Sequence, residues 1–542
     1  MRIGAILRAV VLAGLVLLAA GLARAAGPEV RAIFPAGGQR GTTVAVTASG
    51  NFPKWPVQGW ADRPGVTLAA TADQGKLQVT VAAHAAPGLY WLRLYEAYGI
   101  SAPQPFLVGL QNETVEQEPN NTPAKAQAVS MPIVVNGRLG VGNDADLFAV
   151  TLTKGQTLIA ALEANETLGS PVDSVLQIVS PRGNLLAYNH DHHGLDPQIV
   201  YTAPADGSYL VRVFGFPSAP NSTIGFAGGE KYIYRLTLTT GAFVDYPWPL
   251  AITAGRETAV ELVGWNIPDA LRSIALKADP PHTEIIDPRL ANLVSLPVEP
   301  HNTLVEIEPN ELATPQAIEL PCTLSGRIDK PLDVDAFAFE AKKGAPLVIQ
   351  LASRSLGYPL DGVLEISDLA GKSLARVDDL GNARDPLIEF TPPADGRYRI
   401  AVSDLTRQGS SRHVYRLSVT PAPVDFEVAA DANSYVLAAG KPTEITLSIT
   451  RKGGFDAPIS LSATGLPDFV TAAPVQSAPT GDSAKTVKLV LTASGAIAFS
   501  GPIHIQARAE GASKLEHAAT AATGTGSART GDLWLTVVPA AP

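Results

Sequence analysis

The sequence predicts an all-β protein built from tandem antiparallel β-sandwiches, and three observations lead to this fold class. Segments that alternate apolar and polar side chains recur along the chain, for example at 43–49, 209–215 and 443–450. This period of two is typical of half-buried antiparallel strands. Turn sequences separate these segments and draw on 48 Gly and 44 Pro, whereas helical periodicity is nearly absent. Finally, 542 residues are too many for one core, so several sandwiches in a row are expected.

The first 26 residues are predicted to be a secretory signal peptide and not part of the fold. Arg2 and Arg8 precede an apolar run at 9–23, and residues 23–25 give the small-x-small pattern of a cleavage site. The run is short for a transmembrane span, and no later segment is long and apolar enough to cross a bilayer. We therefore expect a secreted protein, located outside the cell, at the cell surface or in the periplasm, without a membrane span.

Charge and cysteine content narrow the expected partners and the chemistry. Loss of the three arginines of the signal peptide changes the formal charge from -10 to -13. A chain this acidic repels phosphate, so no nucleic-acid partner is expected, whereas cations are compatible with it. The single cysteine, Cys322, rules out an intrachain disulfide. Its surroundings, ELPCTLSGRI, read as a strand, so a buried inert thiol is expected in preference to a catalytic one.

A duplicated segment organises the middle of the chain. VEQEPNNTPAKAQ begins at Val115 and VEIEPNELATPQA begins at Val305. The motifs E-x-E-P-N, G-R, D-x-D-x-F-A, K-G, D-x-V-L-x-I, D-P-x-I and P-A-D-G-x-Y follow in the same order in both copies, with an offset of 189 or 190 residues. A closing Y-R-L occurs at Tyr234 and Tyr415. Such a constant offset indicates two copies of one domain.

The long repeat resembles the bacterial pre-peptidase C-terminal (PPC) domain, a family that includes the collagen-binding domains of clostridial collagenases. The resemblance covers nearly all of each repeat and rests on E-x-E-P-N, D-x-D-x-F and D-G-x-Y. It implies a jelly-roll-like β-sandwich, secretion, and attachment to extracellular hydrolases as a non-catalytic module. The flanking units resemble immunoglobulin-like modules of the IPT/TIG type through short strand–turn motifs. The predicted plan is a signal peptide at 1–26, an immunoglobulin-like sandwich at 27–112, a PPC-like sandwich at 113–240, a small immunoglobulin-like module at 241–302, a PPC-like sandwich at 303–420 and a C-terminal immunoglobulin-like sandwich at 421–542.

The resemblance also implies calcium sites, because some PPC domains bind Ca²⁺ through the acidic segment at their start and a later aspartate pair. An extended E-x-E places both carboxylates on one side, and calcium takes six to eight oxygen ligands. The alternative is that Pro and Asn build a turn while the carboxylates cap backbone amides. With Asn at 121 and Glu at 311, the carboxylate count favours the second site. The candidate ligands are Glu116, Glu118, Asn120, Asn121, Asp144 and Asp146 in the first repeat, and Glu306, Glu308, Asn310, Glu311, Asp333 and Asp335 in the second.

A histidine-rich stretch, YNHDHHGLD at 188–196, is a second candidate metal site. Zinc could bind through His190, His192 and His193. However, adjacent histidines in a strand point to opposite faces, and the matching stretch of the second repeat, ARVDDLGNARD at 375–385, has no histidine. A plain loop is therefore expected, with Asp191 and Asp378 capping its turn.

Two tryptophans are candidates for a ligand-binding surface. Trp55 and Trp60 lie in NFPKWPVQGWADRPG, a Pro-rich loop that interrupts the strand pattern. Exposed indole rings stack on sugars or anchor protein partners, although packing in the core is the common alternative.

The sequence favours a non-enzymatic function. It contains none of the motifs G-x-S-x-G, H-E-x-x-H or the Walker loop, and the assigned sandwiches leave no segment of the size of a catalytic domain. We expect a secreted binding or adhesion-type protein that recognises an extracellular polymer (protein or polysaccharide) or a secreted protein, stabilised by calcium at the start of each PPC-like repeat. The alternative is an extracellular peptidase or glycosidase, or the accessory subunit of one.

Overall fold

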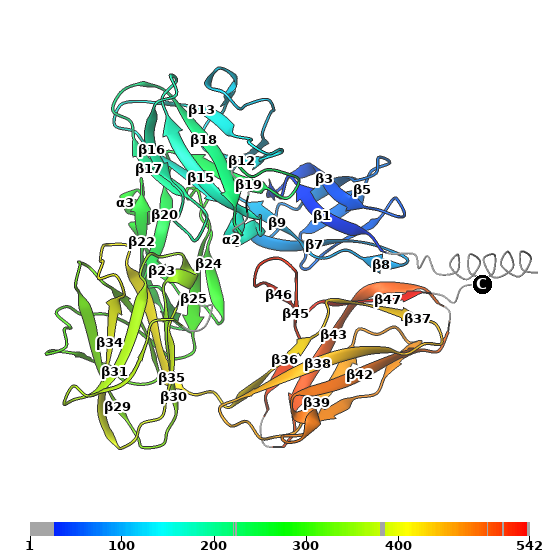
Figure 1. Ribbon diagram of the computed structural model, residues 1–542, viewed down its shortest axis with the longest axis vertical. Coiled ribbons are helices and arrows are strands. Elements are labelled where there is room, and N and C mark those ends of the chain that lie inside the picture. The colour runs from blue at the N-terminus through cyan, green and yellow to red at the C-terminus, as the bar shows by residue number, and fades with distance from the viewer. Residues whose placement is uncertain are drawn as a thin grey trace, which may run out of the picture.

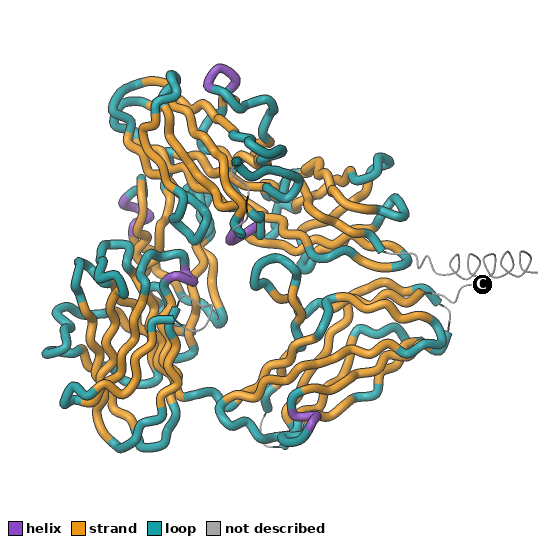
Figure 2. The backbone as a smooth tube through the Cα atoms, in the orientation of Figure 1, coloured by secondary structure: helices purple, strands orange, loops and turns teal. Residues whose placement is uncertain are grey.

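The computed structural model describes residues 27–219, 222, 225–379, 385–495, 497–511 and 514–538. The predicted signal peptide lies outside these residues. Strands dominate the described chain, and its helices are single turns, so the all-β prediction is confirmed (Figure 2). Within the described residues, no helix has the length and apolar character needed to cross a membrane. Five units follow one another along the chain, and each has its own hydrophobic core (Figure 1).

The first unit is one nine-stranded sheet in the order β1-β3-β6-β5-β4-β7-β9-β2, with β8 paired to β7. Strands β4 and β5, which connect its two halves, share a single register pair, Gln58 with Ala69. In β6, alternation turns Leu77, Val79 and Val81 into the core. The strands are β1 (Glu29–Phe34), β2 (Gly37–Gln39), β3 (Thr43–Asn51), β4 (Gln58–Ala61), β5 (Val66–Ala70), β6 (Lys76–Val81), β7 (Gly88–Glu96), β8 (Gly99–Ile100) and β9 (Gln104–Gly109).

The first long repeat folds into two five-stranded sheets that enclose one core. The orders are β10-β12-β19-β14-β17 and β11-β13-β18-β15-β16. Most strands pair antiparallel, but β10 and β11 pair in parallel with β12 and β13 because the chain crosses from one sheet to the other between them. The elements are β10 (Glu113–Val115), η1 (Pro123–Lys125), β11 (Gln127–Ala128), β12 (Ile133–Arg138), β13 (Asp146–Leu152), β14 (Thr157–Glu163), α2 (Asn165–Leu168), β15 (Val172–Val179), β16 (Leu185–Asn189), β17 (Gln198–Thr202), β18 (Gly207–Pro217) and β19 (Ile233–Thr239).

The second long repeat has the same topology. Its sheets run β26-β28-β35-β30-β33 and β27-β29-β34-β31-β32. Cys322 is fully buried in β28, and burial raises the pKa of its thiol to about 12, which agrees with an inert thiol. The elements are β26 (Asn302–Val305), β27 (Gln316–Ala317), β28 (Cys322–Arg327), β29 (Val334–Ala341), β30 (Leu347–Ala352), η2 (Arg354–Leu356), β31 (Gly362–Asp368), β32 (Ser373–Val377), β33 (Leu387–Phe390), β34 (Gly396–Asp404) and β35 (Val414–Pro421).

Two of the repeated aspartate motifs have structural roles. Asp196 of the first D-P-x-I accepts hydrogen bonds from the backbone N–H groups of residues 164–166 and so caps α2. Asp385 caps η2 in the same way through residues 353–355. In P-A-D-G-x-Y, the Asp206 carboxylate accepts the N–H of Lys154 at 2.6 Å, and Asp395 accepts that of Lys343 at 2.7 Å. These aspartates stabilise turns and lie outside the acidic clusters described below.

A small unit separates the two repeats and consists of two three-stranded sheets, β20-β22-β23 and β21-β25-β24. Both sheets contribute to a single apolar cluster around Val260, Leu262 and Leu296. The elements are β20 (Phe243–Trp248), β21 (Ile252–Thr253), β22 (Thr258–Trp265), α3 (Asp269–Arg272), β23 (Ser273–Leu276), β24 (His282–Ile285) and β25 (Val294–Glu299).

The last unit is a larger sandwich of a four-stranded and a six-stranded sheet, with a two-stranded hairpin. In Figure 1 it lies beside the first unit, and β8 contacts both β37 and β47. The elements are β36 (Asp425–Ala430), β37 (Ser434–Ala438), β38 (Thr443–Lys452), β39 (Ile459–Thr464), β40 (Val470–Ala472), β41 (Val475–Ser477), η3 (Asp482–Ala484), β42 (Thr486–Ala493), β43 (Phe499–Ala509), β44 (Glu516–Ala518), β45 (Ala521–Ala522), β46 (Arg529–Thr530) and β47 (Leu533–Val538).

Candidate metal centres

The lead segment of each repeat, residues 115–121 and 305–311, connects the first short strand of one sheet with the first short strand of the other. In the first repeat, the N–H of Leu147 in β13 donates to the carbonyl of Asn120 at 3.1 Å. In the second, Ala336 donates to Asn310 at 2.6 Å. These bonds hold the E-x-E-P-N motif against the strand that contains the second aspartate of D-x-D. The two motifs therefore meet although more than twenty residues separate them.

In the first repeat, Glu118, Asp144 and Asp146 each place a carboxylate oxygen within 4.8 Å of the others. Glu116 lies beside them, and its Oε1 accepts the N–H of Arg138 at 2.9 Å. Asp144 has both oxygens engaged. Oδ2 accepts a hydrogen bond from the N–H of Gly140 at 2.7 Å, and Oδ1 accepts one from Nδ2 of Asn121 at 2.6 Å.

The second repeat clusters a partly different set, Glu306, Glu308 and Asp335, whose oxygens also lie within 4.8 Å of one another. Glu306 Oε2 accepts the N–H of Arg327 at 2.8 Å. Asp333 resembles Asp144, because its Oδ2 accepts the N–H of Asp329 at 3.1 Å. Glu311, predicted as a ligand, is exposed and is not among the clustered carboxylates.

A buried tyrosine completes each cluster, and we did not predict it as a site residue. The hydroxyl of Tyr234 donates to Asp146 Oδ2 at 2.6 Å, and that of Tyr415 donates to Asp335 Oδ2 at 2.5 Å. Each ring lies on the glycine of the G-R motif, because a Cβ on Gly137 would come within 2.1 Å of the Tyr234 ring. The signal was present in the sequence as the repeated Y-R-L, which was used only to align the two copies.

The electrostatics of the clusters favour a cation. Asp146 and Asp335 are fully buried, yet Oδ1 of each has no hydrogen-bond donor in the described part of the chain. Burial first, and then neighbouring carboxylates, raise the pKa of Glu116 and Asp146, and the pKa values of Glu306 and Asp335 are raised in the same way. A buried carboxylate oxygen without a donor is costly unless a cation compensates its charge.

The donor set fits calcium better than a softer ion, because it contains oxygen alone. In the first repeat, Glu116, Glu118 and Asp146 would hold the ion, together with Asn120, whose fully buried side-chain oxygen also has no partner among the described residues. In the second, Glu306, Glu308 and Asp335 would do so. Asn121, Asp144 and Asp333 support the sites through the hydrogen bonds above. Both repeats present three clustered carboxylates, so the number of clustered carboxylates does not favour the second site over the first.

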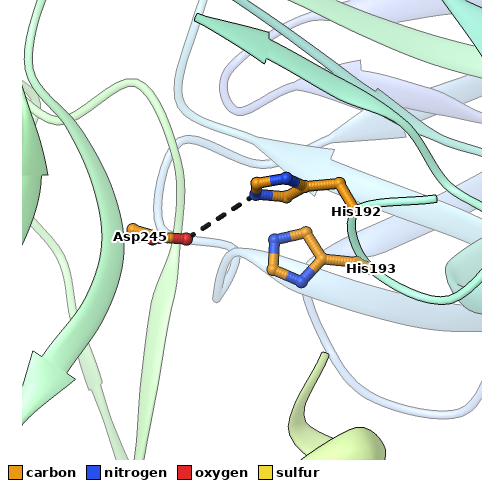
Figure 3. Close-up of side chains that lie close together, drawn as sticks. All are labelled: His192, His193 and Asp245. Atoms are coloured by element: carbon orange, nitrogen blue, oxygen red, sulfur yellow. Dashed lines mark ion pairs between the residues drawn. The ribbon is translucent and has the colours of Figure 1, made fainter. Parts of the chain in front are cut away.

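The histidine-rich stretch splits into two parts. His190 is exposed and pairs with Asp191, Nδ1 to Oδ2 at 2.8 Å. His192 and His193 instead turn toward Asp245 of β20 (Figure 3). The expectation that adjacent histidines diverge is wrong here, because they lie in a tight turn and not in a strand. Asp191 pairs with a side chain, and Asp378 accepts the N–H of Asp379 at 3.0 Å.

The tryptophans of the Pro-rich loop have partners within the chain. Trp55 is half-buried, packs edge-on against Phe52 with ring centroids 5.3 Å apart, and donates its indole N–H to the Thr71 carbonyl at 2.7 Å. Trp60 packs edge-on against Trp534 of the last unit at 5.7 Å. Both rings are half-buried and have packing contacts within the chain, and their role as a ligand surface stays a prediction.

Comparison with known proteins agrees with the duplication. Residues 144–215 and 333–404 each match the profile of the family described as bacterial pre-peptidase C-terminal domain. Both long repeats contain PPC domains. A probable subtilase-type serine protease from Deinococcus radiodurans is 35% identical over 98 residues, which are 18% of this chain and 14% of that protein. The match therefore covers only a small part of either protein.

Two solved structures match parts of this chain at low TM-score. The PPC domain of a collagenase from Bacillus anthracis has a TM-score of 0.17 and 17% identity, and the match covers 21% of this chain and 100% of that one. SGBP-B, from a complex xyloglucan utilization locus in Bacteroides uniformis, has a TM-score of 0.14 and 12% identity, and the match covers 40% of this chain and 73% of that one.

Proposed function

We propose that this chain is an exported, non-catalytic binding protein whose two PPC domains each hold a calcium ion. The observation that carries the calcium proposal is the pair of fully buried aspartate oxygens, Oδ1 of Asp146 and Oδ1 of Asp335, that lack donors among the described residues. The duplication strengthens it, since the same unsatisfied oxygen recurs at the same place in both domains. Backbone capping, the alternative use of these carboxylates, accounts for Asp144 and Asp333 but leaves these two oxygens unexplained.

Calcium would fix how consecutive units are joined. Each lead segment directly follows the preceding unit, so an ion that links it to β13 or β29 would immobilise the junction. Direct contacts already support this geometry. Leu250 N–H donates to Ser325 Oγ at 2.9 Å, and the Thr253 and Thr303 hydroxyls lie 3.0 Å apart. A series of sandwiches held in fixed orientation presents an extended surface, which suits recognition of a polymer.

Calcium is expected to raise the melting temperature of the full chain by on the order of 10 °C relative to chelator. Binding to the folded state alone adds about 2.7 kcal/mol at a hundredfold excess over Kd. Asp335→Ala should reduce this increment, and combining it with Asp146→Ala should abolish it. Differential scanning calorimetry with calcium or EDTA measures it. Glu311→Ala is the matched control and should keep the full increment. An equal melting temperature with calcium and with EDTA in the unmodified chain would remove calcium from the proposal.

The increment should also depend on pH. In the calcium-free protein, the raised pKa values of Glu116, Asp146, Glu306 and Asp335 mean that the folded state binds more protons than the unfolded state. Stability without calcium therefore falls as pH rises from about 4, the unfolded carboxyl pKa, through the raised values. Calcium requires the deprotonated ligands. The calcium-induced shift should consequently be larger at pH 8 than at pH 5, and the reverse order would contradict the site.

The binding function is tested by co-sedimentation of the full chain with insoluble collagen, cell-wall and polysaccharide fractions. Saturable retention by one polymer class, reduced by EDTA, is expected. The alternative is a role in hydrolysis, favoured by the 35% identity with part of a probable subtilase-type serine protease. Incubation of the purified chain with casein and mixed polysaccharides separates the two. Hydrolysis that a single point substitution abolishes would replace the binding proposal with an enzymatic one.

A further inference from the structure

Three units meet around the turn that joins β16 and β17. The N–H of His193 donates to the carbonyl of Asp196, and the N–H of Asp196 donates back to His193, each at 3.0 Å. Gly194 has φ +59° and permits the reversal. The turn brings the rings of His192 and His193 to the same side, with centroids 4.7 Å apart and planes at 83°. Figure 3 shows both rings facing Asp245, which belongs to the small unit.

The three side chains form a compact donor set that is largely removed from solvent. His192 Nε2 lies 3.8 Å from Asp245 Oδ1, with side-chain exposures of 12% and 4%. One ligand atom from each of the three residues lies within 4.8 Å of the others. Nε2 of His192 has no hydrogen-bond partner among the described residues. The group contains nitrogen as well as oxygen donors, unlike the two acidic clusters.

His193 is held in place by a contact with the second PPC domain. Nδ1 faces Gly357 of the second PPC domain so closely that a Cβ there would lie 2.2 Å from it. A partner at the second ring nitrogen commonly fixes the orientation of a metal-binding histidine. Nε2 is left for a ligand.

Asp245 is positioned by Arg412 of the second PPC domain. Arg412 Nε donates to Asp245 Oδ2 at 2.7 Å, and Nη2 donates to Oδ1 at 3.1 Å. These two hydrogen bonds hold the carboxylate in place, and Oδ1 faces the histidines, 3.8 Å from His192 Nε2. Arg412 repels a divalent ion, which weakens binding, but its contact with Oδ2 also fixes the ligating carboxylate.

We propose that His192, His193 and Asp245 bind a divalent transition-metal ion of the zinc type. Two imidazoles and one carboxylate suit Zn²⁺, which takes four ligands at about 2.0–2.2 Å, whereas calcium prefers oxygen. Three protein ligands leave one coordination position for water. That position would face a cavity of about 500 Å³ lined by His193, Asp245, Tyr358 and Asn292, among others. The ion would tie the first PPC domain to the small unit at their contact with the second PPC domain.

Isothermal titration calorimetry of the full chain with zinc chloride tests this site. Excess calcium is kept present so that the acidic clusters are saturated. One saturable zinc site is expected. His193→Ala should weaken it by more than the roughly 10–100-fold typical of a change in a residue that only supports a ligand. His190→Ala, three residues away and exposed, is the matched control and should bind zinc like the unmodified chain.

Anomalous scattering at the zinc edge from crystals of the unmodified chain locates the ion independently of any substitution. A peak between His192, His193 and Asp245 would support the proposal even if His193→Ala failed to fold. No saturable binding at micromolar zinc, an equal affinity in folded His193→Ala, or a single peak elsewhere would overturn it.

Discussion

Replacing Glu113 with alanine should lower the free energy of unfolding of the first PPC domain by about 3–5 kcal/mol, because it leaves a buried guanidinium without its carboxylate. Arg235 of β19 and Glu113 of β10 have side-chain exposures of 2% and 8%. Nη1 and Nη2 of Arg235 donate to the two carboxylate oxygens at 2.8 Å each. Asn136 completes the network by accepting from Arg235 at 3.0 Å and donating to Glu113 at 2.8 Å.

Differential scanning calorimetry of the full chain measures this loss. Because the five units have separate cores, the unfolding transition of the first PPC domain can move to lower temperature while the others stay in place. The second PPC domain provides a matched control, since it has Thr303 in place of Glu113. Thr303→Ala removes only a hydroxyl contact with Thr253 and should cost about 1 kcal/mol. Adding Arg235→Met to Glu113→Ala should recover part of the loss, since it removes the unpaired buried charge. A loss below about 1 kcal/mol for Glu113→Ala would show that the pair is not stabilised as described.

The fold class and the duplication could be predicted because both are local or repeated signals. Alternation in segments such as 76–81 reports directly which side chains are buried. The constant offset between the copies identified the motifs that converge at the acidic clusters, so Glu118, Asp146, Glu308 and Asp335 were correctly selected as neighbours in space. Glu311 was selected by position alone, and nothing in a linear motif indicates that an exposed turn will direct its side chain away from the cluster.

Contacts between units could not be predicted, since they join residues without any shared pattern. Glu113 is part of a buried pair only in the first repeat, so the duplication gave no signal for it. His192 and His193 were assigned to an ordinary loop because their shared orientation depends on a turn closed by Asp196. The partner of Trp60 lies almost the whole length of the chain away. Tyr234 and Tyr415 were missed for a different reason. Both belong to a repeated motif, but nothing in that motif shows that their hydroxyls reach Asp146 and Asp335.

Substitution of Arg93 and Trp60 with alanine should open the arrangement of units without unfolding any of them. Arg93 of β7 is 1% exposed and donates to Asn433, from Nη1 to the carbonyl at 3.2 Å and from Nη2 to Oδ1 at 3.0 Å. Trp534 of β47 packs against Trp60 and also against Tyr95, with a centroid distance of 5.0 Å for the second pair. These contacts join the first unit to the last and so close the chain of five sandwiches on itself (Figure 1).

Small-angle X-ray scattering should detect opening as a larger radius of gyration and maximum dimension. The last unit is joined to the second PPC domain by the short segment 422–424, and loss of its contacts with the first unit leaves it free to reorient about that segment. Arg31→Ala is the control, because Arg31 lies in the same unit as Arg93 but makes only an exposed ion pair with Glu230. It should leave the scattering unchanged. An unchanged radius of gyration in Arg93→Ala/Trp60→Ala would mean that other contacts hold the first and last units together. The five units would then present one rigid surface to any polymer that they bind.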